Sequence, residues 1–409
     1  MPILNNPTEQ ALAAAIVSYR DDLIDFCQRL LQTPSVNGEH DEVHVAELIA
    51  AEARRLGLDA QIVGQYPNRP NVIVSTSDEG ETGLLLLGHL DTVPPGDAAS
   101  WAYPPFSGAI ADGRIYGRGA IDTKGGMAAA LYALAALKQH QQALGESRAQ
   151  FIGVPDEETG ATGTLGVTYL ADHGLLAAKG AIYAYSGSQI ILGHRGLLRY
   201  RLVCAGAAIH TGSHEWQEGT AGANAVTGMA RLLLALESQT FPFSSTPYFE
   251  PYKTVITPGT IISGGVSINI VPDRCEALVD IRTTPDNDVA VIEALLERMI
   301  REIEGEKPGI TFGYERLNFI PAVISDEKAA LFSILGEVIP LVKGFPAERT
   351  VAGPANEGYL LIGRGIPTVC GLGPTGANAH AANEYVEIEG LMDAALIFAL
   401  TGHRMALLG

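Results

Sequence analysis

The spacing of apolar residues predicts that helices open the chain and that buried strands follow. Apolar positions recur at helical intervals in residues 11–31 and 43–56, and Gly57 stands where a helix is expected to end. Residues 84–87 are four consecutive leucines, a run too continuous for a half-exposed strand. We therefore expect two opening helices, followed by a central strand in a sheet that is covered on both faces.

Helical and strand-like segments then alternate, which is typical of an α/β layer domain. The predicted elements are strands at 71–75, 84–87, 150–154 and 181–185 and helices at 127–138 and 165–173. The alternation resumes near the end of the chain, with helices at 329–341 and 387–400 and a strand at 367–372. We interpret residues 1–195 and 316–409 as one domain in which helices cover a mixed sheet.

The residues between these two stretches follow a different order. The pattern predicts a strand at 198–204, a helix at 223–237, strands at 254–262 and 274–282, a helix at 289–304 and a strand at 310–314. This βαββαβ order is typical of a ferredoxin-like domain. We therefore predict that residues 196–315 form a second domain inserted into the first.

Charge and composition exclude several classes of function. Acidic residues outnumber basic ones by 46 to 27, so the net charge is −19, and a field of this sign repels nucleic acids and anionic membranes. No apolar run approaches the ~18 residues that a membrane span needs. The start of the chain lacks the basic and apolar segments of a secretory signal, so we expect a cytoplasmic protein. The cysteines are widely spaced, and we expect them to be reduced and buried: Cys27, Cys204, Cys275 and Cys370.

Candidate chemistry begins just after the leucine run. His89 and Asp91 stand two residues apart, so in an extended backbone they project to the same side, and the carboxylate can orient the imidazole for a metal. Asp122 lies in the glycine-rich segment 117–126, which lacks the spacing of a phosphate-binding loop. An acidic side chain would also repel phosphate, so Asp122 fits a carboxylate that bridges metals better than a phosphate-binding residue. Taken singly, each feature is equally compatible with a strand-end hydrogen bond or a turn cap.

Two further segments complete a set of metal donors. Glu157 and Glu158 directly follow a predicted strand, where one carboxylate can bind a metal and the other can take a proton from water. His380 lies in a loop of small residues near the end of the chain. His89, Asp122, Glu158 and His380 together form a donor set that suits zinc, manganese or cobalt. We expect all four to follow strands of the same sheet.

Polar residues in and beside the inserted domain are candidates for substrate binding. His210 and Asn269 lie on no predicted helix or strand face, and surface roles remain open for both. Arg282 ends a predicted strand, and it can either clamp a substrate carboxylate or pair with a nearby acid such as Asp280. Arg195 and Arg282, with a metal cation, make a pocket locally positive despite the acidic balance. We therefore expect a small substrate that bears a carboxylate.

The order and spacing of these motifs, from His89 to Tyr385, resemble the dinuclear zinc metallopeptidase family. That family includes acetylornithine deacetylase, succinyl-diaminopimelate desuccinylase, aminoacylase and glutamate carboxypeptidase. The resemblance implies a catalytic α/β domain interrupted by a ferredoxin-like lid domain, through which two copies form a homodimer. It also implies that His89 holds one metal, that Glu158 and His380 hold the other, and that Asp122 bridges the two.

The resemblance assigns further roles around this centre. Glu157 is implied as the general base for the metal-activated water, and Asp91 as the residue that orients His89. A cis peptide bond is implied between Asp122 and Thr123. The lid is implied to supply three residues that meet the substrate: His210, Asn269 and Arg282. Of these, His210 is implied to reach into the active site of the partner subunit.

One position departs from the family pattern. The family places a carboxylate at the end of the strand before the lid, whereas residues 183–188 here contain no acid, and Tyr185 stands in its place. Without that charge two metals ~3.5–4 Å apart are less well neutralised, so we predict one tightly bound ion rather than two. Tyr185 either binds the metal as a phenolate or packs beside it.

These inferences predict a metal-dependent hydrolase of a carbon–nitrogen bond, of the amidohydrolase or deacylase type. A first alternative is a hydrolytic deaminase of an aminoaromatic acid such as nitroanthranilate. In that reaction hydroxide attacks the ring and ammonia leaves, and the missing acid resembles that rarer branch of the family. A second alternative is a binding protein that has lost catalysis, although retention of Glu157 argues against it.

Overall fold

The computed structural model describes residues 4 and 6–408, which fall into two compact units. One unit consists of the residues up to His194 together with those from Ile324 onwards, and the other consists of Arg195–Val323. The expectation about an export signal concerns the first residues, most of which lie outside the described part. None of the described helices is long and apolar enough to cross a bilayer.

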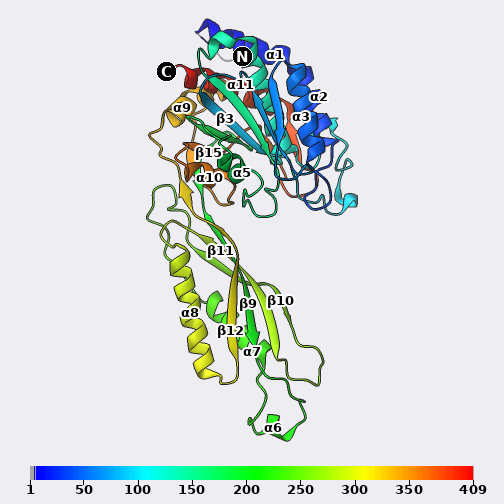
Figure 1. Cartoon of the computed structure of the whole chain (residues 1–409), viewed down its shortest axis with the longest axis vertical. Coiled ribbons are helices and arrows are strands. Elements are labelled where there is room, and N and C mark those ends of the chain that lie inside the picture. Colours follow the sequence, from blue (N-terminus) through cyan, green and yellow to red (C-terminus); the bar gives the residue numbers. More distant parts are fainter. Residues whose placement is uncertain (1–3, 5, 409) are drawn as a thin grey trace. The chain divides into compact units, whose positions relative to one another are not determined.

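The first unit is built on a six-stranded mixed sheet, which confirms the predicted fold class (Figure 1). Its strands lie in the order β1-β2-β6-β3-β7-β15. Strand β3 pairs parallel with β6 and β7, β7 pairs parallel with β15, and β2 pairs antiparallel with β1 and β6. The bounds are Asp59–Val63 for β1, Asn71–Ser75 for β2, Thr82–His89 for β3, Arg148–Val154 for β6, Ala181–Ala184 for β7 and Thr368–Leu372 for β15.

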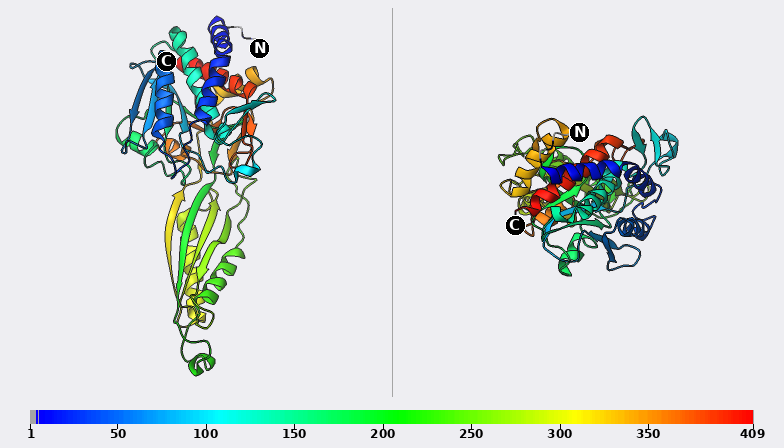
Figure 2. Two further views of the ribbon diagram at one scale, coloured as in Figure 1. Left: turned by 90° about the vertical axis from the view of Figure 1, so that its right-hand side faces the viewer. Right: turned by 90° about the horizontal axis from the view of Figure 1, so that it is seen from above.

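Helices cover both faces of this sheet, which explains why the leucine run is continuous. Leu85 and Leu87 pack with Leu170 and Leu361 of α5 and α10, whereas Leu84 lies beside Gly402 of α11 on the other face. Figure 2 shows α11 and α4 lying together with α1 when the molecule is seen from above. The bounds are Pro7–Ser18 for α1, Arg20–Leu31 for α2, Val43–Arg55 for α3, Gly125–Gln139 for α4, Val167–Asp172 for α5, Ala330–Lys343 for α9, Gly358–Ile362 for α10 and Ile388–Ala406 for α11.

The prediction of a single helix over residues 11–31 is wrong, because the chain forms two helices that meet at Tyr19. The φ and ψ angles of Tyr19 are −86° and 2°, and its hydroxyl donates to the Gln139 side chain 3.2 Å away. Buried residues such as Leu12 and Leu23 keep helical spacing across the break. Hydrophobic spacing therefore could not reveal it.

Two smaller sheets, which belong to the first unit except for Val323 of β13, were not predicted, and most of their strands are only two or three residues long. One has the order β16-β17-β5-β4 and the other β13-β8-β14. The bounds are Ala109–Ala111 for β4, Arg114–Tyr116 for β5, Ile190–His194 for β8, Val323–Ile324 for β13, Arg349–Ala352 for β14, Gly376–Ala377 for β16 and Tyr385–Glu387 for β17.

The second unit contains the predicted βαββαβ order. Its four-stranded antiparallel sheet has the order β10-β11-β9-β12, which is the ferredoxin-like arrangement. The predicted boundary at residue 316 lies inside β12, because that strand continues to Ile320 while paired with β9. The bounds are Gly196–Ala205 for β9, Val255–Gly264 for β10, Arg274–Thr283 for β11, Thr311–Ile320 for β12, His214–Gln217 for α6, Ala225–Glu237 for α7 and Val289–Glu306 for α8.

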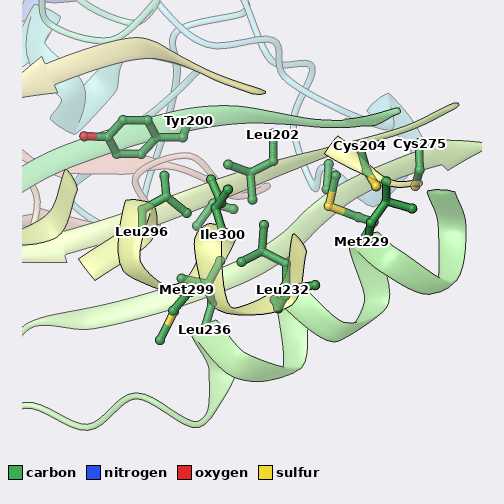
Figure 3. Close-up of a cluster of buried hydrophobic side chains, with 14 of the residues drawn as sticks. Tyr200, Leu202, Cys204, Met229, Leu232, Leu236, Cys275, Leu296, Met299 and Ile300 are labelled. Atoms are coloured by element: carbon green, nitrogen blue, oxygen red, sulfur yellow. The ribbon is translucent and has the colours of Figure 1, made fainter. Parts of the chain in front are cut away.

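Helices α7 and α8 lie against one face of this sheet and form its hydrophobic core (Figure 3). Alternate residues of β11 are buried, as expected for a sheet covered on one side. The N-termini of both helices are capped, because Asn224 accepts from the Thr227 amide and Asp288 accepts from the Val291 amide. All four cysteines are free and buried, which confirms that prediction.

Candidate metal centre

Neighbouring strands of the large sheet bring the first two motifs together. His89 is the last residue of β3 and stands opposite Val154, the last residue of β6, in parallel register. Glu157 and Glu158 follow β6 after two further residues, so they begin at the same edge of the sheet as His89. This juxtaposition agrees with the sequence prediction, because carboxyl ends of parallel strands meet at one edge.

Asp122 and His380 reach the same place by another route. The prediction that they follow strands of the large sheet is wrong. Asp122 lies in a turn between β5 and α4, and His380 lies between β16 and β17. Strand β17 pairs with both β16 and β5, so this small sheet carries both loops. The peptide bond between Asp122 and Thr123 is cis, as the family resemblance implies.

Close packing of α4 places Asp122 near the large sheet. A Cβ atom on Gly126, in the first turn of α4, would lie 1.9 Å from the carbonyl oxygen of Ala184 at the end of β7. Only glycine therefore permits this approach. The Tyr185 hydroxyl, one residue further along, donates to Asp122 Oδ2 over 2.7 Å.

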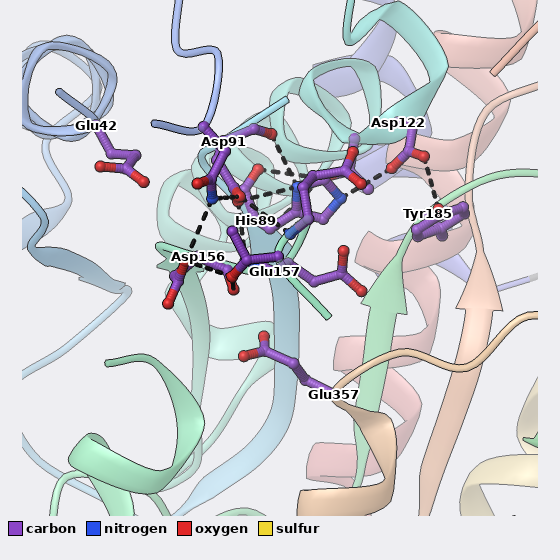
Figure 4. A network of polar contacts seen from close by, with 12 residues as sticks. Glu42, His89, Asp91, Asp122, Asp156, Glu157, Tyr185 and Glu357 are labelled. Atoms are coloured by element: carbon purple, nitrogen blue, oxygen red, sulfur yellow. Dashed lines mark hydrogen bonds and ion pairs between the residues drawn. The ribbon is translucent and has the colours of Figure 1, made fainter. Parts of the chain in front are cut away.

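The four predicted metal ligands converge, and two of them, His89 and Asp122, are labelled in Figure 4. Asp122 Oδ1 lies 2.8 Å from His89 Nε2, and Asp122 Oδ2 lies 3.0 Å from His380 Nε2. His380 Nε2 also lies 3.3 Å from Glu158 Oε1. Donor atoms of Asp122, Glu158 and His380 all lie within 4.8 Å of one another, and so do those of His89, Glu157 and Glu158.

Asp91 contacts both the imidazole of His89 and the backbone of the segment that carries Glu157 and Glu158. His89 Nδ1 lies 2.9 Å from the backbone carbonyl oxygen of Asp91 and 3.5 Å from its carboxylate. The carboxylate accepts the amides of Glu157 and Glu158 over 3.1 and 3.0 Å, and the side-chain amide of Asn37 over 2.6 Å. Asp91 therefore fixes the backbone of both acids, a role that the spacing of the motif did not indicate.

Electrostatics at the centre are dominated by buried acids. Burial raises the pKa of Glu157 well above its usual value, and the charges of Glu158 and Glu357 add to this shift, whereas His89 opposes it. Burial also acts on Asp122, but hydrogen bonds from His380 and His89 outweigh it and lower the pKa of Asp122. Hydrogen bonds to Asp122 and Glu158 raise the pKa of His380 to about 10.

This donor set fits a divalent cation. The carboxylates of Asp122, Glu157 and Glu158 gather around the imidazoles of His89 and His380, and the buried Glu158 Oε1 lies 3.3 Å from His380 Nε2. Buried carboxylates are stable when a counter-charge neutralises them. Imidazole nitrogens with carboxylate oxygens are the mixture that zinc, manganese and cobalt accept.

Sequence reasoning missed two buried acids beside the centre. Glu357, just before α10, is fully buried, and its Oε1 receives no hydrogen bond from the described residues, whereas its Oε2 lies 3.4 Å from the Tyr183 hydroxyl. Glu384 accepts four hydrogen bonds from the segment that carries Asp122. Glu384 stands in the segment that supplied His380, but no spacing rule marked either acid.

The predicted substrate residues lie in the second unit. His210 forms a bridge with Ile270, which brings it near the exposed Asn269, whose backbone carbonyl accepts the Thr211 amide. Arg282 pairs with Asp280 over 2.8 Å, which is the alternative left open by the sequence. Arg195 donates to the backbone carbonyl of Arg282 over 3.1 Å. The structure thus groups these residues as two pairs, His210 with Asn269 and Arg195 with Arg282.

Comparison with known proteins agrees with this architecture. Residues 85–403 match the model of Peptidase family M20/M25/M40. The chain is 28% identical over 380 residues to succinyl-diaminopimelate desuccinylase 2 of Shewanella loihica, covering 89% of this chain and 94% of the relative. It is 26% identical over 416 residues to N-formyl-4-amino-5-aminomethyl-2-methylpyrimidine deformylase of Halalkalibacterium halodurans, with 94% of each covered.

Solved structures share the fold. An M20 family metallo-carboxypeptidase from Sulfolobus solfataricus superposes with a TM-score of 0.74 at 21% identity, covering 95% of this chain and 99% of the other. The dipeptidase Dug1p of Saccharomyces cerevisiae superposes with a TM-score of 0.76 at 16% identity, covering 98% of each chain. The protein therefore belongs to the M20/M25/M40 peptidase family and is a metal-dependent hydrolase that acts on carbon–nitrogen bonds.

Proposed function

We propose that this protein removes the acyl group from a small N-acylated substrate that bears a carboxylate, with one tightly bound divalent ion. The observation that carries the proposal is the convergence of Asp122, Glu158 and His380, with the buried acid Glu157 next in sequence to Glu158. A bound zinc, manganese or cobalt ion would polarise the scissile carbonyl and lower the pKa of a water molecule. The chemistry left to the chain is proton transfer and orientation.

Glu157 is the group that we propose as the carrier of the proton. Its side chain is 8% exposed, and its backbone amide is held by Asp91, so its position is defined before substrate arrives. Glu157 would accept a proton from the attacking water and return it to the leaving nitrogen. His89, held by the carbonyl of Asp91, and Asp122 would bind the ion or orient the groups that do.

The position of Tyr185 supports a single ion. Its hydroxyl donates to Asp122 Oδ2, so this oxygen is shared between a phenol and His380, and no carboxylate occupies the place of Tyr185. The His89 side of the centre therefore has one fewer negative charge than the family pattern supplies. A second ion there would be neutralised less well than the first.

The proposed substrate class follows from polar residues of the second unit and from the relatives. We propose that a substrate carboxylate is bound by four residues: Arg195, His210, Asn269 and Arg282. Arg282 would then release its ion pair with Asp280 and pair with the substrate carboxylate instead. The relatives described above are a desuccinylase and a deformylase, which supports amide hydrolysis over ring deamination. Retained Glu157 and the convergent donors likewise support an enzyme rather than a binding protein.

We also propose a homodimer formed through the second unit. Strand β10 is an edge strand of its sheet, and it exposes the apolar side chains of Ile261 and Ile262, with Val266 and Ile268 exposed just beyond it. An exposed edge strand with apolar side chains is a surface that native proteins cover. A second copy of the chain would cover it.

The test combines metal depletion with a panel of substrates. Protein stripped with a chelator should lose turnover of N-succinyl and N-formyl amino acids and regain it with zinc, manganese or cobalt. Glu157→Gln should abolish turnover while the protein still binds the ion, whereas Glu146→Gln, an exposed acid, should behave as wild type. Turnover that survives both chelation and Glu157→Gln would overturn the proposal, and turnover of aminobenzoates alone would replace it with ring deamination.

A further inference from the structure

A buried carboxylate to which the sequence analysis gave no role ties the two metal-binding loops together. Glu384 stands four residues after His380 and is fully buried. Its Oε1 accepts the backbone amides of Ile121 over 2.9 Å and of Asp122 over 3.1 Å. Its Oε2 accepts the amide of Gly119 over 3.0 Å and Arg118 Nη1 over 2.5 Å.

All four donors to Glu384 lie between residues 118 and 122, the segment that ends at Asp122. Both oxygens of Glu384 are therefore occupied, so Glu384 itself has no free oxygen for an ion. A neutral glutamine could not reproduce this pattern, because its NH2 group would face donors where a carboxylate oxygen now accepts. The partner charge, Arg118, is 2% exposed and lies over the Trp101 ring, which keeps the ion pair out of water.

The loop that carries His380 needs such a constraint. Three of its non-glycine residues have left-handed backbone conformations, with φ values of 65° at Asn378, 60° at His380 and 59° at Asn383. Such conformations are unfavourable for residues with a Cβ atom and persist where the surroundings hold them. Asn383 is held from one side by the Ala102 amide over 2.6 Å, and the next residue is Glu384.

We infer that Glu384 is a positioning residue that sets Asp122 against His380 before the ion binds. The inference rests on the proposed function, because it assumes that these two side chains hold the ion. Affinity for the ion would thus depend on a carboxylate that does not contact the ion. Without Glu384, the Asp122 amide and the strained loop would each lose the contact that couples them.

The first test measures ion affinity directly. Apoprotein is titrated with Mn²⁺ or Zn²⁺ in a calorimeter, for wild type, Glu384→Gln and Glu389→Gln. Glu389 lies five residues away, and its side chain is 79% exposed and paired with Arg20, so its variant is a matched control. We expect Glu384→Gln to bind the ion about 10- to 100-fold more weakly, as substitutions of groups that support metal ligands typically do, and the control to bind as wild type.

An unchanged dissociation constant for Glu384→Gln in folded protein would overturn the inference. A wild type that binds no ion would instead overturn the proposed function, so the two failures are distinguishable. Should Glu384→Gln not fold, hydrogen exchange of the wild-type apoprotein decides. The amides of Ile121 and Asp122 are expected to be as protected as those of α4, and exchange at the rate of an open loop would overturn the inference.

Discussion

The buried acid Glu357 offers a quantitative test of the electrostatics around the centre. Replacing it with glutamine keeps its shape and removes its ability to ionise. Glu357 is fully buried, one of its oxygens receives no hydrogen bond from the described residues, and the other has only a 3.4 Å contact with the Tyr183 hydroxyl. An ionised carboxylate in this place is poorly compensated, so the folded protein should hold the acid in its neutral form.

The size of the effect follows from the pKa difference between folded and unfolded protein. Burial, helped by the charge of Asp91, raises the pKa of Glu357 from 4.5 to about 8. Between these two values the folded protein holds a proton that the unfolded chain releases. The free energy of unfolding therefore falls by about 1.4 kcal/mol per pH unit as pH rises, and by at most about 5 kcal/mol in total. This part of the stability is fully present below pH 4.5 and is lost as pH rises towards 8.

Glu357→Gln should remove that slope. Measured by urea unfolding of chelated protein, its free energy of unfolding should approach that of wild type at about pH 5 and exceed it by several kcal/mol near pH 8. Fluorescence of the buried Trp101 in a Trp216→Phe background would report on the unit that contains Glu357. Glu337→Gln, at a side chain that is 73% exposed, serves as the control. Parallel pH profiles for wild type and Glu357→Gln would refute the reasoning.

Three further outcomes are expected. Tyr185→Glu should restore the missing charge and raise the ion content towards two per chain by elemental analysis, and an unchanged content would contradict the single-ion explanation. Leu232→Ala should destabilise the second unit by about 2–5 kcal/mol in thermal unfolding, because Leu232 is fully buried. Leu234 on the same helix is 63% exposed, so Leu234→Ala should leave the stability nearly unchanged. Ile262→Glu on edge strand β10 should convert a dimer into a monomer in sedimentation, and a dimer that persists would place the interface elsewhere.

The sequence by itself determined the layered architecture and most elements of regular structure. The run of leucines at 84–87 indicated a strand covered on both faces, and β3 is such a strand. The βαββαβ order of the second unit was likewise predicted. Each helix or strand buries one face, so its apolar residues recur at the spacing of a helix or of a strand, and that spacing can be read from the residues of the element alone. The residue types of a metal centre were also visible, since the sequence contains together the imidazole and carboxylate groups that suit zinc, manganese or cobalt.

Tertiary structure alone decided how those residues meet. The helix break at Tyr19 was hidden, because apolar spacing continues across it. Asp122 and His380 come from loops of a small sheet whose strands are too short to leave a periodic pattern. The supporting contacts of Asp91 and Glu384 were hidden for a related reason. Their partners are backbone amides, which every residue carries, so only the folded chain determines which amides a buried carboxylate will hold.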